Sequence, residues 1–183
     1  CSSDLSIGSV DPLNESHLDH LVELNRRFEP VLISEHLCWG SFDGRYFNDL
    51  LPLPYTDEAL AHVVQRIDQV QERLGRTLLI ENLSSYVEFE TSAYPEWEFL
   101  NEVARRSGAQ ILLDVNNIYV SACNHGFDAF QYVDAMNADQ VSEIHLAGHT
   151  RKDIDGASLL IDDHASRVSE PVWHLYGYAI RHL

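Results

Sequence analysis

The chain has 183 residues, of which 45% are hydrophobic and 22% are charged, and this composition is typical of a folded globular domain. Its formal net charge of −17 argues against nucleic acids and anionic membrane surfaces as partners, because both are bound by Lys and Arg. The sequence contains neither an apolar run of about 18 residues nor a signal-peptide pattern, so we expect no membrane span.

Short apolar runs alternate along the chain with longer stretches of helical periodicity, which predicts an α/β fold with right-handed crossovers. The pattern alone leaves a doubly wound sheet and a (β/α) barrel open, and no glycine-rich nucleotide motif is present. The runs that predict strands are apolar on both faces, as in a covered parallel sheet, and cover 31–34, 77–80, 110–113 and 141–144. The predicted helices cover 14–28, 56–74 between the cap Thr56 and the stop Gly75, 95–108, 127–136, and 171 to the end of the chain.

Side chains that can hold a metal ion follow each of these apolar runs. Because the carboxyl ends of barrel strands open at one mouth, such residues would converge there from distant parts of the chain. A mixture of His, Asp and Glu suits iron, manganese or zinc, whereas crowded carboxylates without a cation would repel one another. The residues at these positions are His36, Glu81, Asp114 and His145, and a further run, 159–161, is followed by Asp162, Asp163 and His164.

The stretch IHLAGH, residues 144–149, carries two histidines four positions apart. On a continuous strand His145, Ala147 and His149 would share one face. We interpret His145 as a ligand at the end of a strand, and Gly148 as the residue that lets the backbone turn there. Any one of these residues could be a simple turn or capping residue, so the inference depends on the whole set. Neighbouring polar residues could orient the ligands or contact a substrate, namely Asn82, Asn116, Asn117, His125 and His149.

Three cysteines, Cys1, Cys38 and Cys123, form no C-x-x-C pair, so we expect a cytoplasmic protein without a disulfide framework. We interpret Cys38 as a small buried hydrophobic residue and His62 as a surface residue of a helix. The chain starts without Met and stops inside a predicted helix, so we expect a single domain, 1–183, that is a fragment of a longer protein.

Six motifs, SEHLCW, LLIENLSSY, LLDVNNIYV, NHGFD, EIHLAGH and LIDDH, resemble in order those of the multinuclear non-haem iron-dependent oxidative enzymes. The resemblance implies a TIM (β/α)8 barrel of the xylose-isomerase type with two or three iron ions at its mouth. It also implies oxidative modification, with O₂, of cysteine residues in a ribosomally made precursor peptide. Many members act with a partner protein that recruits the leader of this peptide.

The resemblance also implies a ligand set, with Glu81 as the bridging carboxylate. Asn117 stands where some members carry a histidine for a third iron. The family's early-strand histidine and final-strand glutamate have no counterpart, so the chain would hold only the fourth to seventh strands and would be inactive alone. The implied ligands are His36, Glu81, Asp114, His145, Asp162 and His164.

Two other classes of function remain open from the sequence. A divalent-metal sugar isomerase or a hydrolase on the same barrel would also place His, Glu and Asp at strand ends. Hydrolysis of nucleic acid would require a basic rim, which this acidic chain lacks. The other class is a non-catalytic metal-binding or partner-recruiting remnant. The sequence names neither the peptide nor the product, and it does not fix the number of irons.

Overall fold

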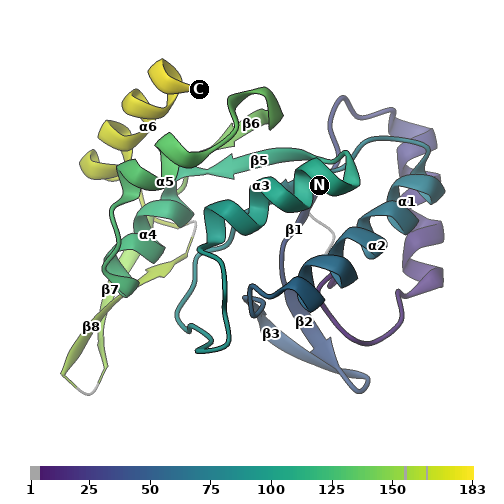
Figure 1. Cartoon of the computed structure of the whole chain (residues 1–183), viewed down its shortest axis with the longest axis horizontal. Coiled ribbons are helices and arrows are strands. Elements are labelled where there is room, and N and C mark those ends of the chain that lie inside the picture. Colours follow the sequence, from purple (N-terminus) through teal and green to yellow (C-terminus); the bar gives the residue numbers. More distant parts are fainter. Residues whose placement is uncertain (1–4, 155, 164) are drawn as a thin grey trace.

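A computed structural model describes residues 5–154, 156–163 and 165–183 of the chain. At its centre lies a four-stranded parallel sheet with the strand order β1-β4-β5-β6 (Figure 1). The predicted α/β class with a parallel sheet is confirmed, whereas the complete barrel and the place of this chain within it stay predictions. The strands are β1 (Ser34–His36), β4 (Leu79–Glu81), β5 (Gln110–Asp114) and β6 (Val141–His145).

The helices begin and end at residues with clear capping chemistry. Asn14 caps the first helix by accepting a hydrogen bond from the His17 N–H, and Thr56 caps the second through the Ala59 N–H. Gly75 adopts a φ of 64° directly after the second helix, a conformation that glycine reaches without strain. These predicted boundaries are confirmed. The helices are α1 (Glu15–Phe28), α2 (Asp57–Leu74), α3 (Glu96–Ser107), α4 (Val115–His125), α5 (Ala129–Ala135) and α6 (Glu170–His182).

The first two predicted strands were placed too early in the chain. Val31 is 86% exposed, and the first strand forms only from Ser34, where its backbone meets Leu79 of β4. The second strand likewise begins at Leu79 and not at Thr77. Apolar content locates a run of this kind, but the strand starts only where a neighbouring strand lies beside it.

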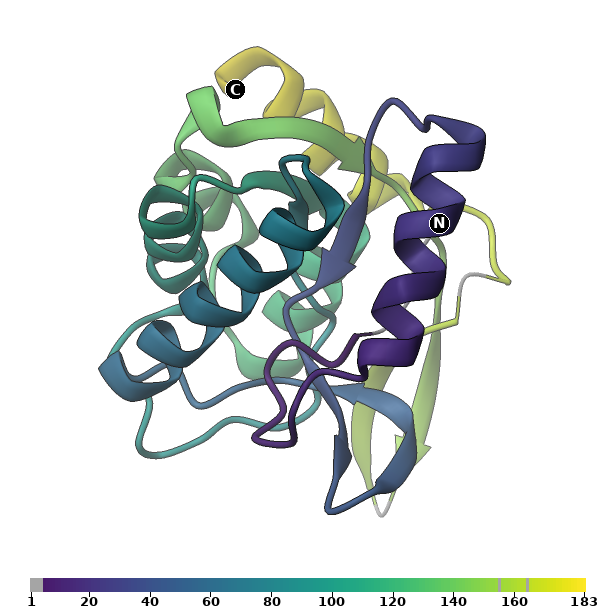
Figure 2. The ribbon, with the colours of Figure 1, turned by 90° about the vertical axis from the view of Figure 1, so that its right-hand side faces the viewer.

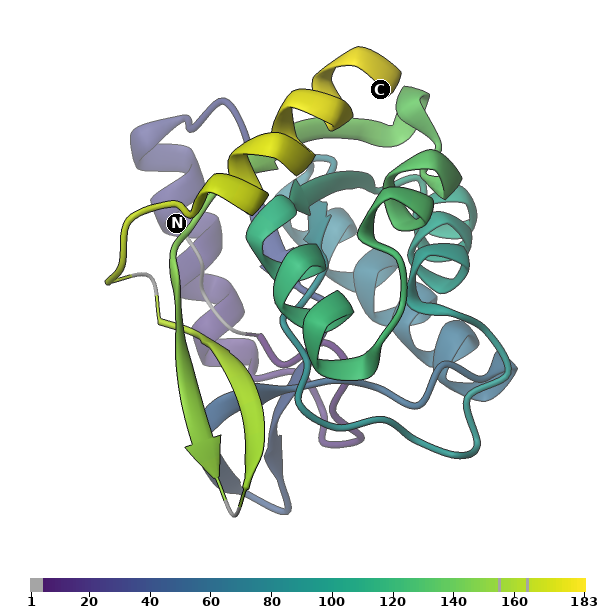
Figure 3. The ribbon, with the colours of Figure 1, turned by 90° about the vertical axis from the view of Figure 1, so that its left-hand side faces the viewer.

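One helix and two hairpins were not predicted. Helix α4 follows β5 without a loop, because Asp114 ends the strand and also caps the helix through the Asn117 N–H. The run 159–161 belongs to an antiparallel hairpin and not to the parallel sheet. Both hairpins project from the same end of the molecule (Figures 2 and 3). They are formed by β2 (Trp39–Phe42) with β3 (Arg45–Leu51), and by β7 (His149–Ile154) with β8 (Ala157–Asp162); a short 3₁₀ helix, η1 (Ala138–Gln140), precedes β6.

In the residues that the structure describes, one hydrophobic core joins the helices to the sheet, and Phe99 and Tyr132 are among its largest fully buried side chains. Cys38 is fully buried, as predicted. Within the described part of the chain, no helix is both long enough and apolar enough to cross a membrane. The two hairpins follow the chain from the carboxyl ends of β1 and β6.

Candidate metal centre

Four predicted metal ligands are the last residues of four adjacent strands. His36 ends β1, Glu81 ends β4, Asp114 ends β5 and His145 ends β6. His36 lies opposite Glu81 across the β1–β4 pair, and Asp114 lies opposite His145 across the β5–β6 pair. Neighbouring strands lie about 4.8 Å apart, so side chains from these ends can meet. The sequence thus identified the edge of the sheet where polar groups gather.

Glu81 lies between two imidazoles. Its Oε2 is 3.3 Å from His36 Nε2, and its Oε1 is 3.5 Å from His145 Nδ1. Glu81, Asp114 and His145 each offer one ligand atom, and these three atoms lie within 4.8 Å of one another. Each oxygen of one carboxylate therefore faces a different histidine, and a second carboxylate joins the group.

The chemistry of this donor set fits a transition-metal ion. Glu81 and Asp114 are only 6% and 0% exposed, so their carboxylates are not an ordinary acidic patch in solvent. Buried carboxylates are stable only when they are paired, hydrogen-bonded or bound to a metal. His145 is partly exposed and leaves one side of the group open to solvent. Mixed nitrogen and oxygen donors suit iron, manganese or zinc.

Asn82 and Asn117 form hydrogen bonds that link the strand ends carrying Glu81 and Asp114. Asn82 accepts a hydrogen bond from the Asp114 N–H at 2.8 Å and donates to the Asp114 carbonyl at 3.0 Å. The Asn117 side chain donates to the Asn82 carbonyl at 2.9 Å. All three residues are buried, so these bonds fix the end of β5 relative to the end of β4.

A second polar chain leads from α4 to the β7–β8 hairpin. Asn116 Nδ2 donates to Asp162 at 3.0 Å, and Asn116 Oδ1 lies 2.8 Å from His149 Nδ1. Because that amide oxygen can only accept, His149 Nδ1 carries the hydrogen and Nε2 keeps its lone pair. Burial lowers the pKa of His149, and the nearby Asp163 opposes this shift. Asp162 is not a member of the three-residue group in the described part of the chain, and His164 lies outside the described residues.

The two histidines of IHLAGH contact different residues: His145 contacts Glu81, and His149 contacts Asn116. The strand ends at His145, as expected, and His149 begins the next strand, β7. The expected reason for Gly148 was wrong, since this glycine does not have a positive φ. A Cβ added there would lie 2.0 Å from the Ser166 carbonyl oxygen. Gly148 is therefore required for close approach of two backbone segments and not for a turn.

Sequence reasoning missed Glu143, whose Oε1 is 3.2 Å from His145 Nε2. Both ring nitrogens of His145 consequently face carboxylates, one from β4 and one from its own strand. The available signal was spacing, because residues two apart on a strand point to the same face.

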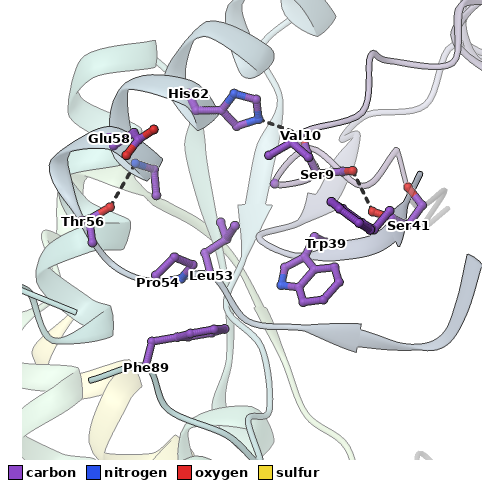
Figure 4. A pocket seen from close by; sticks show the side chains of 13 residues that line it. Ser9, Val10, Trp39, Ser41, Leu53, Pro54, Thr56, Glu58, His62 and Phe89 are labelled. Carbon is purple, nitrogen blue, oxygen red and sulfur yellow. Dashed lines mark hydrogen bonds between the residues drawn. The ribbon is translucent and has the colours of Figure 1, made fainter. Parts of the chain in front are cut away.

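An apolar cavity of about 440 Å³ lies beside β2, which begins three residues after His36. Figure 4 shows Trp39, Leu53 and Phe89 around it. His62 also lines the cavity and bonds the Ser9 carbonyl at 2.8 Å, so it is not the plain surface residue that the sequence suggested. The cavity provides space for apolar groups close to the strand end.

Comparison with known proteins decides the family. Residues 2–183 match the family described as RiPP precursor modification enzyme MbnB/TglH/ChrH. The chain belongs to this family. The resemblance seen in the six motifs is thereby confirmed.

The family's curated relatives extend beyond this chain. It is 58% identical over 177 residues to a UPF0276 protein of Anaeromyxobacter sp. (strain Fw109-5), a match that covers 97% of this chain and 61% of the relative. UPF0276 proteins of Acaryochloris marina and Vibrio parahaemolyticus are 49% and 50% identical, with 63% and 61% of their lengths covered. The chain thus spans about three fifths of the length of these relatives.

One arrangement in this family member resembles a hydrolytic triad. Ser85 Oγ is 2.7 Å from His125 Nε2, and His125 Nδ1 is 3.4 Å from Glu88 Oε2. However, His125 Nε2 also lies 3.0 Å from the Ser85 carbonyl, which can only accept a hydrogen bond. Nε2 therefore carries a hydrogen and is not free to take the hydroxyl proton, as a catalytic base must. The geometry indicates a brace between α4 and the loop after β4.

Proposed function

We propose that the protein is part of an iron-dependent oxidative enzyme that modifies cysteine residues of a ribosomally made precursor peptide with O₂. The observation that carries this proposal is the convergence of buried Glu81 and Asp114 with His145 at the carboxyl ends of parallel strands. Membership of a precursor-modification family supports the peptide substrate. We further propose that the sheet is completed to a (β/α)8 barrel, whose active sites lie at this end of the strands.

Each residue of the centre has a proposed task. Glu81 is suited to bridge two ions, because its two oxygens face different imidazoles, those of His36 and His145. Asp114 supplies a further oxygen while its Oδ1 remains bonded to the Asn117 N–H. Asp162 and His164 are proposed to complete the ligand set. Iron, when bound, would supply a Lewis acid for the cysteine thiolate and a redox centre for O₂.

The surroundings would position the peptide and limit access of water. The side of the centre at His145 is open, and the hairpins follow directly from the strands that end there. The apolar cavity beside β2 offers a place for side chains of the peptide near the reacting cysteine. A separate partner protein is proposed to recruit the leader, as the resemblance implies.

The test uses a cysteine-containing precursor peptide encoded beside the gene, with the full-length protein loaded with Fe²⁺ without oxygen, because this chain alone is expected to be inactive. O₂ uptake and a change in peptide mass are expected on mixing in air, and both should be lost in Glu81→Gln. Glu72→Gln, an exposed site on α2, is the matched control and should behave as the unaltered protein. An O₂-independent reaction supported by Mg²⁺ or Mn²⁺ would contradict the proposal and favour the isomerase or hydrolase alternative.

A further inference from the structure

A second, smaller cavity of about 220 Å³ lies apart from the metal centre. It is formed by the segment before α2, the loop between β4 and α3 with the start of α3, and the end of α4 with Phe127. Leu53 and Phe89 line both this cavity and the larger one, so they form a common wall. All of its lining residues lie between positions 52 and 127, within the described part of the chain.

Glu96, the first residue of α3, lines the cavity. Interactions with the Leu83 backbone and with the hydroxyl groups of Tyr55 and Tyr132 favour the ionised form of its carboxyl group. Burial nevertheless raises the pKa of Glu96 to about 7, because these interactions do not offset the lost hydration. A carboxylate in such surroundings is normally stabilised by a cation.

None of the residues that line the cavity is a Lys or Arg. Its single imidazole, His125, is engaged at the wall with the Ser85 carbonyl and with Glu88. Glu88 adds a second negative charge to the lining. Tyr94, another lining residue, donates a hydrogen bond from its hydroxyl to Asp57, which brings a third carboxylate close to the cavity. The electrostatic character of the cavity is therefore negative, in a protein whose net charge is −17.

Aromatic rings supply most of the remaining wall. Trp97 lies against Phe127 with ring centroids 5.6 Å apart, and both line the cavity together with Tyr55, Tyr94 and Phe89. The faces of such rings attract ammonium and guanidinium groups, and the attraction increases where water is excluded. A carboxylate and several aromatic rings in the lining of one cavity suit an organic cation.

We propose that this cavity binds the cationic side chain, lysine or arginine, of the peptide that reaches the metal centre. The link to the metal centre rests on the proposed function; the cation site does not. Ser85 lies four residues after Glu81, so the two sites are separated by at most about 14 Å of extended chain. A peptide could therefore place a cysteine at one site and a basic residue, a few positions away, at the other.

The probe is the methylamide of N-acetyl-arginine, and its neutral counterpart is the same compound made from citrulline, which has nearly the same shape. Binding is followed by NMR through the indole N–H signal of Trp97. At pH 8 we expect saturable binding of the arginine compound and at least tenfold weaker binding of the citrulline compound. Glu96→Gln should weaken arginine binding at least tenfold, whereas Glu98→Gln, an exposed change on the same helix, should not.

Equal binding of arginine and citrulline, or unchanged binding in Glu96→Gln, would overturn the proposal. An equal loss in Glu98→Gln would also overturn it, because general surface charge would then explain the effect. The Glu81→Gln variant separates the cation site from the proposed function: it should bind the arginine compound normally even where metal binding and O₂ uptake are lost. Failure of iron binding in the unaltered protein would refute the oxidative function alone.

Discussion

Replacing Glu96 with glutamine should stabilise the protein at alkaline pH and have little effect at acid pH. The folded state raises the pKa of Glu96 from 4.5 to about 7, mainly through burial. The folded protein therefore holds this proton more tightly than the unfolded chain does. Between pH 4.5 and about 7 the unfolded chain binds fewer protons at this group, so the stability of the fold falls as the pH rises.

The size of the effect follows from the same shift. At about 1.4 kcal/mol for each tenfold change in the proton equilibrium, ionised Glu96 costs the fold about 3 kcal/mol. The cost is nearly complete at pH 8 and is below about 1 kcal/mol at pH 5. Glutamine keeps a polar side chain of nearly the same shape at this position, but it never ionises. Glu96→Gln should consequently exceed the unaltered protein in stability at pH 8 by up to about 3 kcal/mol.

Urea unfolding at pH 5 and pH 8, followed by circular dichroism, measures this difference. Other groups titrate equally in both proteins, so their effect on stability cancels in the comparison. One such group is Glu102, because hydrogen bonds from Arg105 and Arg106 lower its pKa to about 2. Glu98→Gln controls for the loss of one charge at the start of α3. A stability difference between Glu96→Gln and the unaltered protein that is the same at both pH values would refute the reasoning.

Three further predictions concern the metal centre and its support. Glu81→Gln should lower the affinity for Fe²⁺ by more than the roughly 10–100-fold lost when a residue that only hydrogen-bonds to a ligand is removed, whereas Glu72→Gln should leave the affinity unchanged. Anaerobic titration calorimetry measures both variants, and equal affinities would exclude Glu81 as a ligand. Asn82→Ala removes both bonds to the Asp114 backbone and should lower Fe²⁺ affinity about 10–100-fold, so an unchanged affinity would show that this brace is dispensable. Gly148→Ala forces a methyl group against the Ser166 carbonyl and should cost about 1–3 kcal/mol in urea unfolding, and an unaltered midpoint would show that the two segments separate without cost.

The local signals that were read correctly are those in which one residue determines the structure. Asn14, Thr56 and Gly75 bound helices through their own side chain or backbone freedom, so no knowledge of the tertiary structure was needed. The positions of His36, Glu81, Asp114 and His145 followed from the end of each apolar run, since parallel strands place such ends at one edge.

Helix α4 was missed because its stability comes from tertiary packing. Its sequence, VNNIYVSACNH, is rich in asparagine and β-branched residues, which are weak helix formers. The helix is held by contacts with β8 and α6 and by the Asp114 cap. The Glu96 site was missed for a related reason, because Tyr55 and Glu96 come from different elements and meet only in the folded chain.

The measurement that tests the central claim most directly is the metal content of the protein purified without oxygen, combined with an Fe²⁺ titration. The account predicts iron bound in stoichiometric amount, two or more ions per molecule in the full-length protein, and its loss in Glu81→Gln. Absence of iron binding, or full retention of iron by Glu81→Gln, would contradict it.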